Sequence, residues 1–318
     1  MTMRNRRALL WLLGTSAVAA SPAFSACSTA EKPKPPPLVL QDDDAAKPST
    51  PPTTPTEPPP PPPPPDAGPP KGTIYAHTGR TLFLFEPYGK TLTRIGDFSC
   101  LNPSDRLSEV GDIAVNRDGE VYGTTLNGRF LRIDPASATC TEIAQVPNTP
   151  GYPNSLSFVP RGTLDPANDA LVGYNEEDYV RIDVATGNIT KIGTLNPPDA
   201  STRYRSSGDV VSIGQERTYL TAHTLGPDGG DLDAGDVLVQ VDPKTGRRLR
   251  IAGNTGRKNL YGMGYWGGKA YGFNAAGEIL SIDPQSATTT PLPIPRPDAS
   301  ATQGVWYGAG STTVAPSQ

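Results

Sequence analysis

Five side chains of this sequence have the types and positions to do chemistry. Asp112 and Asp209 occupy equivalent positions in two copies of a repeated pattern, and Ser155 occupies that position in a third copy. Hard cations such as Ca²⁺ bind several oxygen ligands, so these three residues form a candidate calcium site. The alternative is that each carboxylate accepts hydrogen bonds from backbone amides and only fixes the local structure.

His77 and His223 are the only histidines of the chain. Histidine titrates near neutral pH and can act as a general base or a metal ligand. Both are candidate catalytic residues, together with Asp112 and Asp209, for a hydrolase or a lyase. No GxSxG nucleophile motif accompanies them, so structural roles are the alternative.

Two further polar segments are candidate binding sites. The segment Gly226–Asp236 carries Asp228, Asp231, Asp233 and Asp236 and partly resembles an acidic calcium loop, but it lacks the closing bidentate glutamate. A solvated hairpin tip is the alternative. A second group combines acidic, basic and aromatic side chains, namely Glu176, Glu177, Asp178, Arg203, Tyr204 and Arg205. This mixture suits recognition of a polar partner such as a glycan or a protein.

The segments that must position these residues are five copies of one repeat. Each copy has an acidic residue before a turn, apolar residues one and three positions earlier, and an aliphatic residue nine positions later. The acidic residues are Glu86, Asp134, Asp183, Asp242 and Asp283, which lie 48, 49, 59 and 41 residues apart. The alternation is typical of half-buried strands, and the spacing is typical of propeller blades with four strands each.

An innermost strand is expected in every blade. The predicted strands are Gly111–Val115, Asn154–Phe158, Gly208–Val211 and Tyr261–Tyr265, and Gln303–Tyr307 is expected to complete the first blade from the far end of the chain. The residue just before the first inward aliphatic is then Asp112, Ser155, Asp209, Gly262 or Gly304, which directs two carboxylates toward one mouth of a central channel. We therefore predict an all-β, five-bladed propeller over residues 72–313, with residues 314–318 as a C-terminal tail.

The segment Phe130–Ile143 and its four repeats follow a theme of the form IDP.TG followed by IG. This theme resembles the repeats of secreted bacterial propellers of the YVTN or PQQ type. The resemblance implies a blade geometry but no single chemistry, because similar propellers include binding proteins, lyases and lactonases. The tryptophan-docking positions of quinone-dependent enzymes have no match in this sequence.

The N-terminal residues predict export and anchoring to a membrane. Arg4, Arg6 and Arg7 precede an apolar run, which is typical of an export signal over residues 1–26. The sequence Phe24-Ser25-Ala26-Cys27 resembles a bacterial lipobox, which implies a lipid on Cys27. Residues 28–71 include eight consecutive prolines and favour a disordered stalk. Because Ser28 is not the aspartate of an inner-membrane retention signal, we expect the outer membrane, on its periplasmic side or at the cell surface.

Net charge and cysteine content bear on the class of partner and on disulfide formation. A net charge of −4 gives no electrostatic argument for binding nucleic acid. Cys100 and Cys140 fall in neighbouring repeats and could form a disulfide in an oxidising compartment, although two separate thiols are the alternative. We expect a monomeric, lipid-anchored binding or scaffold module for a polar partner, a glycan or an envelope protein, with a carboxylate-based hydrolase or lyase as the alternative.

Overall fold

The computed structural model describes residues 73–147, 151–214, 217–295, 297 and 305–317. The chain divides into two units, 1–62 and 63–318, and all the described residues belong to the second unit. The predicted export signal, the lipidated Cys27 and the proline-rich stalk therefore lie outside the described residues. Within these residues no helix is long and apolar enough to cross a membrane.

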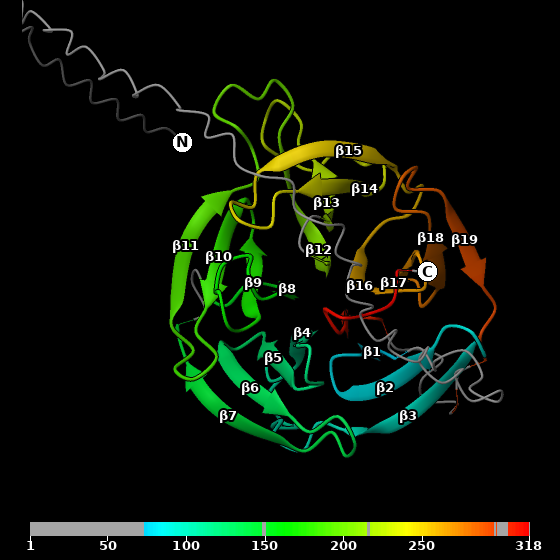
Figure 1. Ribbon diagram of the computed structural model, residues 1–318. Coiled ribbons are helices and arrows are strands. Elements are labelled where there is room, and N and C mark those ends of the chain that lie inside the picture. The colour runs from blue at the N-terminus through cyan, green and yellow to red at the C-terminus, as the bar shows by residue number, and fades with distance from the viewer. Residues whose placement is uncertain (1–72, 148–150, 215–216, 296, 298–304, 318) are drawn as a thin grey trace, which may run out of the picture. The chain divides into compact units, whose positions relative to one another are not determined.

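The described residues form five antiparallel sheets of four strands, arranged as the blades of a propeller (Figure 1). From the centre outward, blade one contains β20 (Gly308–Ser311), β1 (Ile74–His77), β2 (Thr81–Glu86) and β3 (Thr91–Asp97). Blade two contains β4 (Val110–Val115), β5 (Val121–Thr125), β6 (Arg129–Ile133) and β7 (Cys140–Gln145). Blade three contains β8 (Ser155–Val159), β9 (Ala170–Asn175), β10 (Asp178–Ile182) and β11 (Ile189–Thr194).

Blade four contains β12 (Tyr204–Ile213), β13 (Arg217–Thr224), β14 (Val237–Val241) and β15 (Arg248–Asn254). Blade five contains β16 (Leu260–Trp266), β17 (Lys269–Asn274), β18 (Ile279–Ile282) and β19 (Thr289–Leu292). Each innermost strand contacts the innermost strands of both neighbouring blades, so the ring is closed. The predicted five-bladed propeller is confirmed.

The strand that closes the ring lies later in the chain than the sequence predicted. The prediction was Gln303–Tyr307, but the strand that pairs with β1 is Gly308–Ser311. Gln303 and Gly304 lie outside the described residues, and Tyr307 precedes the strand. The physical reason is crowding at the centre, because a Cβ atom on Gly308 would lie 2.1 Å from Oδ1 of Asp112. A position this close to a neighbouring blade requires glycine.

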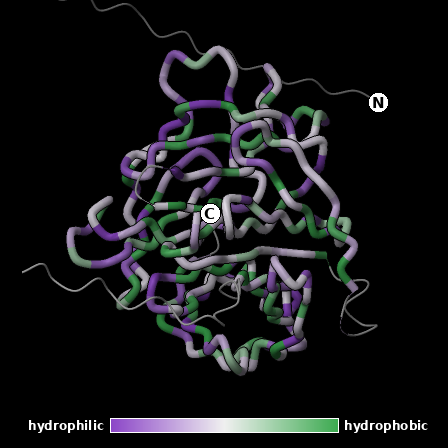
Figure 2. Tube along the Cα trace, turned by 45° about the vertical axis from the view of Figure 1, so that its right-hand side comes forward, coloured by the Kyte–Doolittle hydropathy of each residue, from purple (hydrophilic) through white to green (hydrophobic). Residues whose placement is uncertain are grey.

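The hydrophobic core is divided among the interfaces between neighbouring blades. The described residues form five clusters of buried apolar side chains, and each cluster joins two adjacent blades. Figure 2 shows how hydrophobic and hydrophilic positions follow one another along the strands. At the interface of blades one and five, Trp306 is fully buried and packs edge-on against Phe83 and Phe273, with ring centroids 5.4 Å away in both pairs.

The acidic residue of each repeat fixes the turn that follows it. Oδ1 of Asp134 accepts a hydrogen bond from the amide of Ala136 at 2.7 Å, and Oδ1 of Asp283 accepts one from Gln285 at 2.7 Å. Gly246 in the equivalent turn of blade four has a φ of 67°, a value that favours glycine. These turns define one face of the propeller, which we call the turn face. The opposite face, formed by the loops between blades and by the loops between second and third strands, is called the loop face.

A disulfide joins the first two blades. Cys100 follows β3 and Cys140 begins β7, and their Cα atoms are 5.4 Å apart. The prediction of a covalent link between neighbouring repeats is confirmed.

Hydrogen bonds to Asp169 join three blades on the turn face. Its carboxylate accepts hydrogen bonds from the amide of Arg117 in blade two, from the amide of Arg161 in blade three, and from the hydroxyl of Thr313 after the last strand of blade one.

Candidate functional site

Asp112 lies in β4, the innermost strand of blade two, and is completely buried. Its Oδ1 accepts a hydrogen bond from the amide of Ile113 at 2.8 Å, and its Oδ2 accepts one from the amide of Leu156 at 2.6 Å. Ile113 belongs to the same blade and Leu156 to the next blade. The carboxylate therefore links the innermost strands of blades two and three.

Asp209 has the same role two blades further along the ring. Its side chain is also fully buried, and it accepts hydrogen bonds from the amides of Val210 and Met263, both at 2.7 Å. The carboxyl groups of Asp112 and Asp209 also interact electrostatically with each other. Burial raises the pKa of both groups well above the ordinary value for aspartate, and for Asp112 the charge of Asp209 adds to the rise.

Ser155 lies in the predicted position but bonds within its own blade. Its hydroxyl donates to the carbonyl of Tyr174 at 3.3 Å and accepts from the amide of Tyr174 at 2.8 Å. In the described ranges, no group of three histidine, cysteine or acidic residues has the arrangement of a metal site. With each oxygen of Asp112 and Asp209 bonded to a backbone amide, the geometry favours the structural alternative for these residues over calcium ligation.

His77 ends β1 beside Asp112 and is fully buried. Its Nδ1 donates to the carbonyl of Thr78 at 2.9 Å, so Nε2 carries the lone pair. Nε2 lies 4.0 Å from Oδ1 of Asp112 and has no hydrogen-bond partner among the described residues. Burial lowers the pKa of His77 to about 4, which keeps the ring neutral at physiological pH. The structure thus brings His77 and both aspartates together beneath the loop face, in a space closed to solvent.

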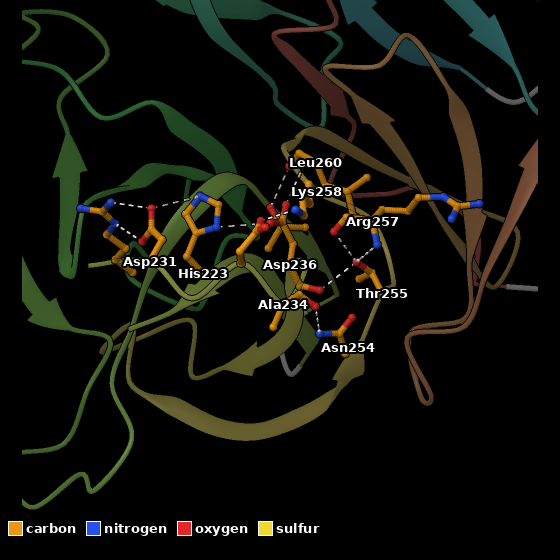
Figure 3. Close-up of polar contacts among 12 residues, drawn as sticks. His223, Asp231, Ala234, Asp236, Asn254, Thr255, Arg257, Lys258 and Leu260 are labelled. Atoms are coloured by element: carbon orange, nitrogen blue, oxygen red, sulfur yellow. Dashed lines mark hydrogen bonds and ion pairs between the residues drawn. The ribbon is translucent and has the colours of Figure 1, made fainter. Parts of the chain in front are cut away.

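His223 lies elsewhere, on the loop face of blade four (Figure 3). Its Nδ1 is 3.3 Å from Oδ1 of the buried Asp236, and its Nε2 is 3.9 Å from Oδ2 of Asp231. The interaction with Asp236 raises the pKa of His223, although partial burial opposes the rise. Arg205 binds both oxygens of Asp231, at 2.7 and 2.6 Å, and holds the pKa of that carboxyl below its usual value.

The acidic segment between β13 and β14 is attached to the rest of the loop face by these contacts and others. Asp233 pairs with Lys258, and Oδ2 of Asp236 accepts from the amide of Leu260 at 2.7 Å. The side-chain amide of Asn254 donates to the carbonyl of Ala234 at 2.7 Å (Figure 3). Most of the acidic side chains that suggested a calcium loop thus pair with cations or amides of neighbouring segments.

The predicted polar binding group is also largely paired within itself. Arg203 pairs with Glu177, Arg205 with Glu176 at 3.2 Å, and Asp178 with Lys191 at 2.6 Å. Tyr204 is buried rather than displayed, and the guanidinium of Arg248 lies 5.0 Å from its ring centroid. The group forms a network of ion pairs on the loop face.

A cavity of about 470 Å³ opens where the five blades converge, and we call it the mouth. It is lined by Gly111, Leu126, Asn154, Gly208, Tyr261, Ala275, Val305 and Tyr307. Two of the aliphatic side chains in this lining are unusually exposed, with 40% of Leu126 and 38% of Val305 accessible to solvent. Sequence reasoning missed this site.

The repeats contain a signal for the mouth, one residue before the position that holds Asp112, Ser155 and Asp209. The residues that precede Asp112, Ser155, Asp209, Gly262 and Gly308 are Gly111, Asn154, Gly208, Tyr261 and Tyr307. All five line the mouth, one from each blade. Because the last strand was placed too early, Tyr307 could not be recognised as a member of this set.

Comparisons with known proteins show no family for this chain. The sequence matches no protein-family model and no curated protein, so the resemblance to YVTN or PQQ repeats stays a prediction. Among solved structures, this chain is similar to a protein of unknown function from Bacteroides caccae, with 10% identity, a TM-score of 0.35, and coverage of 76% of this chain and 98% of the other. It is similar to the Dos1 propeller, with 13% identity, a TM-score of 0.35, and coverage of 69% and 54%. It is also similar to BamB from Moraxella catarrhalis, with 11% identity, a TM-score of 0.30, and coverage of 70% of both chains. The chain is a five-bladed β-propeller, a fold that commonly serves as a binding or scaffold module.

Proposed function

We propose that this protein is an exported binding module that is attached to a membrane of the cell envelope by a lipid on Cys27 and binds its partner through the loop face. The single observation that carries the proposal is the contrast at the centre of the propeller. The candidate catalytic groups Asp112, Asp209 and His77 are fully buried, whereas the mouth above them exposes aliphatic and aromatic side chains. Exposed apolar surface inside a cavity is typical of binding sites.

The route of the chain supports this orientation. Ile74 begins β1 opposite Ser311 and Phe85, next to the turn that follows Glu86, whereas His77 at the other end of β1 pairs with Gly308. β1 therefore begins at the turn face, and the mouth opens on the opposite face. A lipid anchor at the N-terminal end would leave the loop face free to bind.

The geometry gives less support to a hydrolase or lyase. A general acid or base must come within hydrogen-bond distance of its substrate. Asp112 and Asp209 have no exposed surface, and their oxygens already accept hydrogen bonds from backbone amides. His223 is accessible, but its carboxylate neighbours Asp231 and Asp236 are already held by Arg205 and by the amide of Leu260.

The anchor is tested by metabolic labelling of cells with an alkyne fatty acid, followed by fractionation. We expect label and membrane association in the native protein and the loss of both in Cys27→Ser. Equal labelling of the two proteins, or a native protein that is unlabelled and soluble, would rule out the anchor.

The binding face is tested by photo-crosslinking of the full chain in the cell envelope. A benzophenone amino acid is placed either at Leu126 in the mouth or at Leu249, which is 59% exposed on the outer strand β15. We expect discrete adducts from position 126 and none from position 249. Adducts from position 249 alone, or from neither position, would contradict binding at the loop face.

A further inference from the structure

The mouth offers an occupant many apolar contacts and few polar ones. Tyr261 and Tyr307 contribute aromatic rings, and Leu126, Ala275 and Val305 contribute aliphatic groups. Tyrosine supplies a large contact area with little side-chain entropy to lose, which is why it is frequent at interfaces. The lining therefore favours a ligand group that is itself apolar.

The polar groups of the mouth are too few for a sugar ring. Asn154 provides a side-chain amide, and Tyr261 and Tyr307 provide hydroxyls. A sugar carries hydroxyls around its whole ring, and each hydroxyl that is buried without a hydrogen-bond partner weakens binding. An apolar side chain has no such requirement and fits this lining better than a glycan does.

The charged residues around the mouth are paired with one another. Ion pairs join neighbouring segments of the loop face, and we call this set the rim: Arg80–Glu109, Arg203–Glu177, Arg205–Asp231, Lys258–Asp233 and Arg257–Glu278. Since each cation already has a carboxylate, the rim offers no uncompensated charge of one sign to attract a charged ligand. An uncharged occupant is consistent with this balance.

An apolar centre surrounded by a polar rim is the arrangement found in protein–protein interfaces. A few anchor residues insert at the centre and dominate the binding energy, while the rim excludes water and contributes little. A small molecule would fill the mouth and leave the rim unused. A peptide segment would place one side chain in the mouth and lay its backbone across the polar groups of the rim.

From these observations we infer that the mouth binds an extended segment of a partner protein through one large, uncharged, apolar anchor side chain. This inference rests on the proposed function and names its partner class. Leu126 and Val305 become buried against the anchor, and the tyrosines enclose it from the sides of blades five and one. The buried aspartate pair below supports the floor and does not contact the occupant.

The inference is tested by selecting a displayed library of random linear peptides on the purified full chain. We expect enriched peptides to share one large aliphatic or aromatic residue, and replacement of that residue by alanine to abolish binding. Leu126→Glu should weaken binding at least about tenfold, because it removes roughly the contribution of one buried leucine. Leu249→Glu, an equally drastic change on the outer strand, should leave affinity unchanged.

A second variant and a second probe keep the test decisive. Val305→Glu should reproduce the loss of affinity seen with Leu126→Glu, and both variants should keep the native melting temperature because both side chains are partly exposed.

An array of immobilised oligosaccharides is probed in parallel with the peptide library. Oligosaccharide binding that Leu126→Glu abolishes would overturn the peptide inference while leaving the loop face as a binding site. Peptides that bind native protein and Leu126→Glu equally, or peptides with a charged anchor, would overturn it as well. Failure of both probes, together with the absence of photo-adducts at position 126, would refute the proposed function itself.

Discussion

Replacing Asp112 by alanine should show whether the buried carboxylate holds the ring together. The substitution leaves the amides of Ile113 and Leu156 buried without acceptors, and each such group costs about 1–3 kcal/mol. We therefore expect Asp112→Ala to lower the free energy of unfolding by roughly 2–6 kcal/mol near pH 5. For a domain of this size, each kcal/mol lowers the melting temperature by about 2–4 °C.

The effect of Asp112→Ala should also depend on pH. Both aspartates have a folded-state pKa raised above the unfolded value of about 3.9, so the native protein binds more protons than the unfolded chain between these values. The stability that the protonated pair provides is complete below the unfolded pKa and is lost as pH rises through the folded pKa. Removing one carboxylate relieves the repulsion within the pair. The difference between the native protein and Asp112→Ala should therefore shrink from pH 5 toward alkaline pH.

The assay is thermal and urea unfolding at several pH values, followed by circular dichroism. Asp199→Ala is the matched control because Asp199 is exposed in the loop before β12, and we expect it to change stability by less than about 0.5 kcal/mol. Asp112→Asn keeps the shape and one acceptor, so its cost should fall between those of the control and Asp112→Ala. A loss below about 1 kcal/mol at pH 5, or a loss that grows with pH, would refute the assignment of Asp112 as a link between blades whose pKa is raised by burial.

Two further predictions concern other contacts. The Cys100–Cys140 disulfide spans 40 residues, and the loop-entropy relation predicts a stabilisation of about 4 kcal/mol. Reduction, or the double variant Cys100→Ala/Cys140→Ala, should therefore lower the free energy of unfolding by roughly that amount. Lipid labelling at Cys27 should stay unchanged. The pKa of His223 is raised, so its contribution to stability is complete below about pH 6.5 and is lost as pH rises through the folded pKa. His223→Gln should therefore cost more stability at pH 6 than at pH 8 in thermal melts, and an equal cost at both values would show that protonation of this ring does not stabilise the loop face.

The blades could be predicted because their signal is local. Asp134 accepts hydrogen bonds from the turn that directly follows it, and the apolar residues one and three positions earlier, Ile133 and Leu131, lie in the interface with the preceding blade. The acidic residue, the turn that it stabilises and the strand before it are adjacent in the sequence. The pairing of Cys100 with Cys140 followed from the same register, since equal repeats bring the end of one outer strand beside the next.

The roles of the site residues could not be predicted in the same way, because they depend on neighbours distant in the chain. Nothing near Asp112 in the sequence indicates that the amide of Leu156 would occupy its second oxygen. Similarly, the acidic residues between β13 and β14 suggested a calcium loop until Arg205 and Lys258, from other segments, were found against them. A cluster of carboxylates is ambiguous in sequence because cations and amides from elsewhere can serve in place of a metal.

The misplaced closing strand and the missed mouth have one physical cause. Val305, Trp306 and Tyr307 have high β-propensity, whereas Gly308-Ala309-Gly310-Ser311 has little, so local preference favours the wrong segment. At the centre of the ring five strands converge, and a Cβ on Gly308 would lie 2.5 Å from Nε2 of His77. A side chain at position 308 would clash there, and the large residues lie earlier in the chain. Trp306 lies in the interface of blades one and five, and Val305 and Tyr307 line the mouth. The crowding that requires glycine in the last strand thus also places apolar side chains at the entrance of the channel, where a partner can reach them.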